Sequence, residues 1–139
     1  MIIEQWKIQM NKWYIKLSGG SYVKDIDERI SIIAKACSDK NGLDVKLLNL
    51  KKLTPIADFF VIASGNSTTQ VIAIVDEIEE KMGNAGYPLL GKEGYETGRW
   101  VLMDFGDIIV HVFHREDREF YNLEKLWADS EEIELDDEC

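Results

Sequence analysis

The feature that most constrains the fold is an apolar segment that runs directly into a helical pattern. Residues 59–63 (FFVIA) are uninterrupted apolar residues, residues 64–67 (SGNS) are small and turn-forming, and apolar residues recur at helical spacing over 71–82. Ser67 and Gln70 also have the spacing of a capping box at a helix N-terminus. We therefore predict a fully buried strand, a tight turn and a helix, which is a unit from which α/β domains are built.

Further elements are predicted around this unit from periodicity and turn residues. Asp25 and Glu28 form a second capping-box pattern, and residues 104–107 (DFGD) have the composition of a hairpin turn. In chain order, these elements are a helix over 25–41, a strand over 44–50, a short strand and glycine-rich loop within 87–98, two strands within 99–113, and a helix over 115–128 with apolar Phe120, Leu123 and Trp127. The order predicts one α/β domain with a mixed β-sheet of about five strands flanked by helices.

The junction at residues 64–67 has two interpretations. Many α/β proteins hold a phosphate or nucleotide at such a helix N-terminus, because free backbone N–H groups and the helix dipole favour an anion there. The same residues are explained without a ligand if Gly65 forms the turn and Ser67 caps the helix. Since the sequence contains neither GxGxxG nor GxxxxGK[ST], nucleotide binding is the less favoured interpretation.

The sequence predicts no catalytic residue, cofactor or metal site. Nucleotidyl transfer needs carboxylates that converge on metal ions, whereas Asp104 and Asp107 lie three residues apart across a glycine turn. His111 and His114 have no Cys, Asp or Glu at metal-motif spacing, and the position of His111 on its strand predicts a surface or packing role. A nucleotide-binding or nucleotidyltransferase enzyme remains the alternative to a non-enzymatic protein.

The charge of the chain favours a basic protein as its partner. With 26 acidic and 16 basic residues, the formal net charge is -10, which disfavours direct nucleic-acid binding and favours encounter with a basic protein, such as a ribosomal or chromatin protein. Cys37 and Cys139 form no disulfide or metal pattern, and no apolar run approaches the length of a membrane span. We expect a soluble, cytoplasmic protein without membrane association.

Aromatic and basic residues are interleaved in the second half of the chain. Residues of these types are common anchors of protein interfaces. The aromatic members are Tyr95, Trp100, Tyr121 and Trp127, and the basic members are Lys92, Arg99, Arg115 and Arg118. For Trp127 we favour docking of the last helix against the sheet, and for Trp100, on an edge-like strand, we favour recognition of a partner.

The two ends differ in composition from the central region. Residues 1–22 are mildly basic and rich in Trp and Ile, and we interpret them as an N-terminal extension, either a translated leader or a disordered segment. A helix that binds a membrane surface or a partner is the alternative for this stretch. The domain proper is expected over 23–129. Residues 131–139 carry six carboxylates, so 130–139 is predicted to be a disordered acidic tail.

Four blocks of the sequence together resemble the ribosomal silencing factor family, also called Iojap-like. They are TPIADFFVIASGNSTTQVIAI, the pair Glu93-Gly94, WVLMDFGDIIVHVF and the pattern RxFYNLEKLW, and the resemblance extends from about Val23 to Ala128. It implies a fold related to nucleotidyltransferases that lacks their catalytic carboxylates.

The resemblance also implies a function and a partner. Such a factor is expected to bind the large ribosomal subunit through ribosomal protein number fourteen, to block its association with the small subunit sterically, and so to repress translation during starvation or stationary phase. It is also expected to form a homodimer when free. The partner contact is expected on the later strands and their loops, at Lys92, Glu93, Trp100, Asp104, His111, Arg118 and Tyr121.

Overall fold

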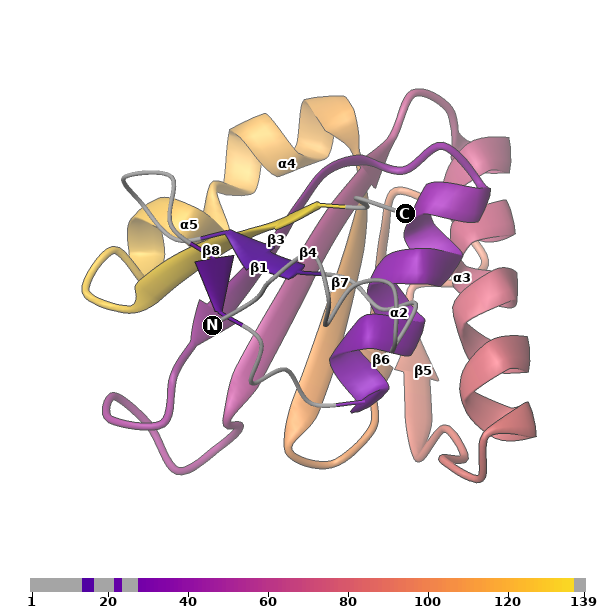
Figure 1. Cartoon of the computed structure of the whole chain (residues 1–139). Helices are drawn as coiled ribbons and strands as arrows, with labels where there is room; N and C mark the ends of the chain where they lie inside the picture. Colours follow the sequence, from indigo (N-terminus) through magenta and orange to yellow (C-terminus); the bar gives the residue numbers. More distant parts are fainter. Residues whose placement is uncertain (1–13, 17–21, 24–27, 137–139) are drawn as a thin grey trace.

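A single sheet with helices on both faces organises the molecule, whose computed structural model describes residues 14–16, 22–23 and 28–136 (Figure 1). The elements in chain order are β1 (Tyr14–Lys16), β2 (Tyr22–Val23), α2 (Glu28–Asp39), β3 (Leu43–Asn49), β4 (Phe59–Gly65), α3 (Thr68–Asn84), β5 (Gly91–Glu93), β6 (Trp100–Asp104), β7 (Ile108–His114), α4 (Arg115–Tyr121), α5 (Leu123–Leu126) and β8 (Glu131–Asp136). The strand order is β2-β1-β8-β3-β4-β7-β6-β5. β4 and β7 are parallel, and the other described pairs are antiparallel. The predicted mixed α/β class is confirmed.

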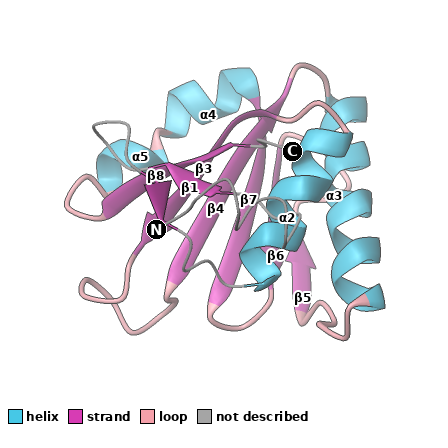
Figure 2. Ribbon diagram, in the orientation of Figure 1, coloured by secondary structure: helices cyan, strands magenta, loops and turns pink. Residues whose placement is uncertain are grey.

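Side chains of the central strands alternate between two cores. Val61 and Val110 face the larger core, which α2 and α3 cover, while Phe60 and Ile62 face the smaller core with Leu123 of α5. Figure 2 shows α2 and α3 on one side of the sheet and α4 and α5 on the other. Because helices cover both faces of β4, that strand is apolar almost throughout.

The predicted strand, turn and helix around residues 64–67 are confirmed. β4 ends at Gly65, and the hydroxyl of Ser67 caps α3 by accepting a hydrogen bond from the backbone N–H of Gln70 at 3.1 Å. The side chain of Gln70 accepts a bond from the N–H of Asn66 at 2.6 Å and donates to the carbonyl of Asn41 at 2.8 Å. The turn is therefore held by bonds within the chain, which also tie α3 to the end of α2.

The predicted hairpin within 99–113 is also confirmed. β6 and β7 pair antiparallel, and the Asp104 carboxylate accepts a bond from the N–H of Gly106 at 2.8 Å inside the turn. Gly106 has φ of +97°, a left-handed conformation that glycine adopts without strain.

The prediction of one continuous helix over 115–128 is wrong. Asn122 has φ of +48°, which ends α4, and its side chain then accepts a bond from the N–H of Lys125 to cap α5. Asparagine is suited to this double role because it tolerates the left-handed region and is a strong helix cap. As a result Phe120, expected on the buried face of one helix, is 80% exposed.

The predicted disordered tail is wrong for Glu131–Asp136. These residues form β8, which pairs with β3 on one side and with β1 on the other. Leu135 is buried in the larger core, and the ammonium of Lys46 lies 3.1 Å from the Glu132 carboxylate, which offsets part of the negative charge. In the expected N-terminal extension, Tyr14–Lys16 forms β1, and Tyr22 forms β2 together with Val23 of the expected domain. Asp25 of the predicted capping box lies outside the described residues.

Candidate functional site

Aromatic side chains gather on the sheet face that carries α4. The ring of Trp100, at the start of β6, stacks on Phe113 with 4.9 Å between centroids and lies 4.8 Å from the ring of Tyr121. Trp100 and Phe113 are cross-strand partners in register, so the sheet itself sets this contact. The ring of Phe120 meets Tyr121 edge to face at 5.0 Å. We call Trp100, Phe120 and Tyr121 the aromatic patch.

His111 lies beneath this patch and fixes the orientation of Trp100. The indole N–H of Trp100 donates a hydrogen bond to Nδ1 of His111 at 3.1 Å. Since the indole nitrogen can only donate, Nδ1 must be unprotonated and the neutral ring carries its proton on Nε2. Burial lowers the pKa of His111 to about 4, which keeps the ring neutral at physiological pH. His111 is 4% exposed and its ring is 4.5 Å from that of Phe60, so its role is packing rather than surface contact.

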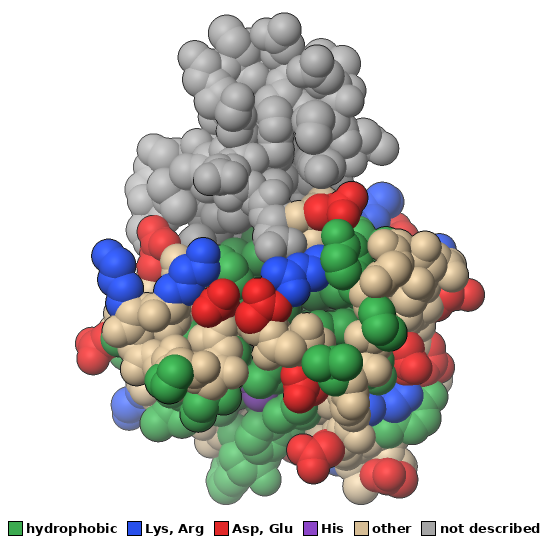
Figure 3. Space-filling view, turned by 90° about the horizontal axis from the view of Figure 1, so that it is seen from below, with side chains coloured by type: hydrophobic (Ala, Val, Ile, Leu, Met, Phe, Trp, Pro, Cys, Tyr) green, Lys and Arg blue, Asp and Glu red, His purple; other side chains and the backbone are tan. Residues whose placement is uncertain are grey.

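Other large apolar side chains are exposed to solvent. Leu90 is 68% exposed, Leu126 is 71% exposed, and Tyr121 of the patch is 49% exposed. Figure 3 shows hydrophobic side chains gathered in the lower part of the view, with acidic side chains beside them. Trp127, by contrast, is half-buried with its ring 5.8 Å from Phe60, as expected for a residue that docks the C-terminal helix.

The structure brings together only part of the predicted partner-binding set. Glu93 pairs with Leu102 across β5 and β6, and alternation along β6 places Leu102 and Asp104 on the same face as Trp100. Lys92 instead pairs with Met103, a residue of the larger core, and therefore lies on the opposite face.

Lys92 is engaged with α3 rather than with the patch. Its ammonium lies 2.8 Å from the Glu79 carboxylate and 4.1 Å from the centroid of the Tyr95 ring. The bond to Glu79 raises the pKa of Lys92.

The two carboxylates considered for metal binding serve separate structural contacts. Asp104 holds the hairpin turn, whereas Asp107 forms two bonds to the guanidinium of Arg29, at 2.6 and 3.0 Å. The bond from Arg29 lowers the pKa of Asp107. Among the residues that the structure describes, no three His, Cys, Asp or Glu side chains are grouped as metal ligands.

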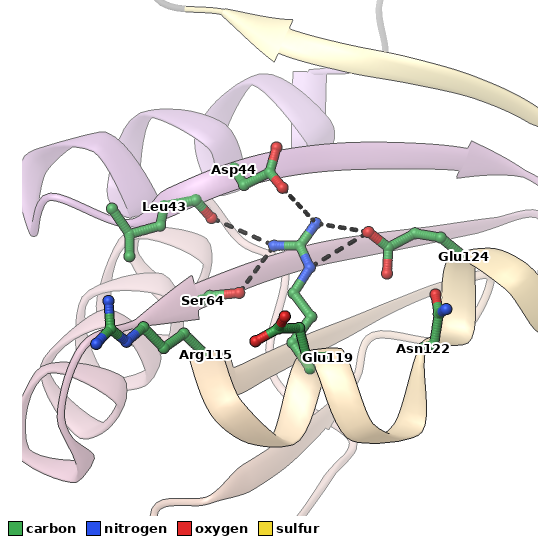
Figure 4. Close-up of a pocket in the computed structure, with 8 residues that line it drawn as sticks. Leu43, Asp44, Ser64, Arg115, Glu119, Asn122 and Glu124 are labelled. Carbon is green, nitrogen blue, oxygen red and sulfur yellow. Dashed lines mark hydrogen bonds and ion pairs between the residues drawn. The ribbon is translucent and has the colours of Figure 1, made fainter.

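Arg118, also in the predicted set, is a buried connection between four elements (Figure 4). One guanidinium nitrogen donates to the hydroxyl of Ser64 at 2.8 Å and to the carbonyl of Leu43 at 3.3 Å. The other two nitrogens donate to the carboxylate of Glu124 at 3.0 and 3.3 Å, and Asp44 lies 3.6 Å away. These residues line a hollow of about 360 Å³ at the end of β4.

Several residues of this region were not singled out from the sequence. Ser64 was considered only as part of the turn at residues 64–67, with or without a bound anion, whereas its hydroxyl accepts a bond from an arginine of the same chain. Glu124 accepts a hydrogen bond from Arg118 at 3.0 Å, and Asp117 accepts one from Arg99 at 2.6 Å. Glu124 lies six residues after Arg118, a spacing that brings side chains together only because the helix breaks between them.

Known proteins resemble this chain over most of its described length. The family model described as "Ribosomal silencing factor during starvation" matches residues 23–139. The ribosomal silencing factor RsfS of Halalkalibacterium halodurans is 46% identical over 109 residues, which are 78% of this chain and 93% of that protein. RsfS of Bacillus subtilis is 44% identical over 107 residues, covering 77% and 91% of the two chains.

The fold is shared with a solved structure as well. The crystal structure of protein CV0518 from Chromobacterium violaceum superposes with a TM-score of 0.72 at 36% identity, covering 75% of this chain and 87% of that one. No helix in the described residues is long and apolar enough to cross a membrane. The family match, the relatives and the shared fold agree with the resemblance of the four sequence blocks. The chain belongs to the ribosomal silencing factor family.

Proposed function

We propose that this protein is a non-enzymatic, cytoplasmic silencing factor that binds the large ribosomal subunit through ribosomal protein number fourteen. Its bulk then blocks association with the small subunit, and translation is repressed during starvation or stationary phase. Membership of the family supports a ribosomal role. The proposal requires only stable binding, because steric exclusion involves no chemical turnover.

The exposed aromatic patch is the observation that carries this proposal. Phe120 is 80% and Tyr121 49% exposed, and the ring of Tyr121 contacts both Phe120 and Trp100, whose orientation is fixed by His111. Aromatic side chains presented on a rigid sheet and a short helix are suited to anchor a protein interface, since little rotamer entropy is lost on binding. We propose that the patch is the centre of the contact.

Charge supports a basic partner for the same face. Glu93 is exposed at the edge of the sheet on the side of Trp100, and Asp104 lies farther along that face. Acidic groups around an apolar centre complement a basic ribosomal protein and accelerate encounter with it. Lys92 lies on the opposite face, and Arg118 is buried, so the proposed contact surface contains neither.

We also propose that the free protein is a homodimer in which a second copy covers the patch. Exposed aromatic and aliphatic side chains such as Phe120 and Leu90 would be removed from water in such a dimer. Binding to the ribosome would then compete with dimerisation. The nucleotide-binding alternative has less support, because Ser64, Ser67 and Gln70 all bond within the chain.

The proposal is tested by co-sedimentation with isolated large subunits, followed by addition of small subunits. We expect saturable binding of one protein per large subunit and a matching loss of joined ribosomes. A protein treated with a magnesium chelator and then returned to ribosome buffer should be equally active. Loss of activity after that treatment, or subunit joining that is unchanged at saturating protein, would contradict the proposal.

A further inference from the structure

Two arginine contacts, made at the adjacent residues Asp117 and Arg118, hold the short helix α4 on the sheet. Arg99 of the loop before β6 bonds to Asp117 at 2.6 and 3.3 Å, and Arg118 reaches back to the end of β4 and forward to Glu124 beyond the helix break. A helix of seven residues has almost no stability of its own. Its orientation is therefore set by these side-chain contacts.

Arg118 uses four of its five N–H donors within the chain, and the carboxylate of Asp44 lies 3.6 Å from the nitrogen that carries the fifth. The residue is 8% exposed, and its three guanidinium nitrogens already bond to Ser64, Leu43 and Glu124 (Figure 4). Turning Arg118 outward would leave Glu124, whose side chain is 19% exposed, without its closest cation. Removing one partner of such a pair is strongly unfavourable.

Arg118 and the aromatic patch belong to the same short helix. Tyr121 is the last residue of α4, three positions after Arg118, and its ring rests 4.8 Å from Trp100. Asn122 follows in the left-handed conformation and leads into α5, which presents Glu124 to the same guanidinium. The bond to Glu124 thus closes the bend between α4 and α5, and the bond to Ser64 fixes that bend on the sheet.

We propose that Arg118 is a positioning residue that holds Tyr121 against Trp100, and that it does not itself touch the ribosome. This inference rests on the function proposed above only for the effect on ribosome binding. Arg118 and Glu124 act as one unit, so loss of either side chain should disturb the patch to the same extent, although Glu124 is not one of its aromatic residues.

The test compares Arg118→Lys, Glu124→Gln and the double variant by two measurements. The first is the Kd for large subunits at several salt concentrations. The second is the NMR signal of the Trp100 indole N–H in the free protein, assigned with Trp100→Phe, which reports the ring of Tyr121 beside it. Arg29→Lys is the matched control, because it alters another two-bond arginine–carboxylate pair, between α2 and the hairpin turn.

We expect each single variant to shift the indole signal and to weaken binding about tenfold, with the double variant no weaker than the worse single one. The salt dependence of the Kd should be unchanged, and Arg29→Lys should alter neither readout. If Arg118→Lys weakens binding whereas Glu124→Gln leaves the Kd unchanged, Arg118 contacts the ribosome directly and the inference is wrong.

An indole signal that stays in place in both single variants would equally overturn the inference, since the patch would not depend on Arg118. The two proposals fail separately. If the unaltered protein does not bind large subunits, the proposed function is wrong, whereas the indole shift in the free protein still decides whether Arg118 positions the patch.

Discussion

Replacing Trp100 by alanine should weaken both the fold and ribosome binding, by amounts that follow from its contacts. The side chain stacks on Phe113 and makes a tilted ring contact with Tyr121, and each aromatic pair contributes about 0.5–1.5 kcal/mol. Its hydrogen bond to His111 adds about 1 kcal/mol. We therefore expect Trp100→Ala to lower the free energy of unfolding by about 2–4 kcal/mol, measured by urea denaturation.

The effect on binding should be separate from the effect on folding. An anchor residue at the centre of an interface contributes about 2 kcal/mol or more, which corresponds to a Kd roughly 30-fold weaker. Trp100→Phe keeps an aromatic ring but removes the donor to His111, so its stability should fall by only about 1 kcal/mol. Its Kd should lie between those of the unaltered protein and Trp100→Ala.

The control for these measurements is Trp127→Phe. Trp127 packs on Phe60 outside the aromatic patch, so its replacement should lower stability without changing the Kd. If Trp100→Ala is folded at the assay temperature and binds large subunits with an unchanged Kd, the reasoning that places Trp100 at the centre of the contact is refuted.

Three further predictions concern stability. Asn122→Ala should lower the free energy of unfolding by about 2 kcal/mol, because it removes the cap of α5 and places alanine at φ of +48°. In the same urea titration Asn122→Gly should recover part of that loss, because glycine adopts this φ without strain. The folded protein keeps His111 neutral down to a pKa of about 4, while the unfolded chain takes up the proton below about 6.5, so stability should fall as the pH is lowered through this window. His111→Phe should flatten that part of the curve, and equal slopes for the two proteins between pH 7 and 5 would contradict the assignment. Truncation after Ser130 removes β8 and buried Leu135, so it should lower the free energy of unfolding by at least about 2 kcal/mol. This loss should appear as a lower midpoint of thermal unfolding. An unchanged midpoint would mean that β8 adds no stability.

Local patterns of the sequence were sufficient where neighbouring residues determine the structure. The capping pair Ser67 and Gln70 and the hairpin turn at 104–107 lie within four residues of their partners, and both are confirmed. The break at Asn122 was missed because the apolar pattern continues across it, although asparagine carries the signal for a left-handed cap. The tail was misjudged because its composition favours disorder, whereas a ladder with β3, some 80 residues earlier, orders it.

The candidate site was predictable in its residue types but not in its roles. Trp100 was expected to recognise a partner and remains a proposed contact, whereas Lys92 faces the opposite side of the sheet because of the register between β5 and β6. The bond between Arg118 and Ser64 joins residues 54 positions apart, so no local spacing reveals it. Because Arg118 is buried, its role is structural instead of the expected contact with a partner.

The most direct test of the central claim is a photo-crosslink from the exposed patch to the ribosome. A benzophenone amino acid in place of Phe120, which is 80% exposed, should leave the fold intact and crosslink on large subunits to ribosomal protein number fourteen, identified by mass spectrometry. The same probe in place of exposed Lys35, on α2 at the other face of the sheet, should give no such crosslink. The account would be contradicted if position 120 crosslinked only to other ribosomal components. It would also be contradicted if position 35 alone crosslinked to ribosomal protein number fourteen.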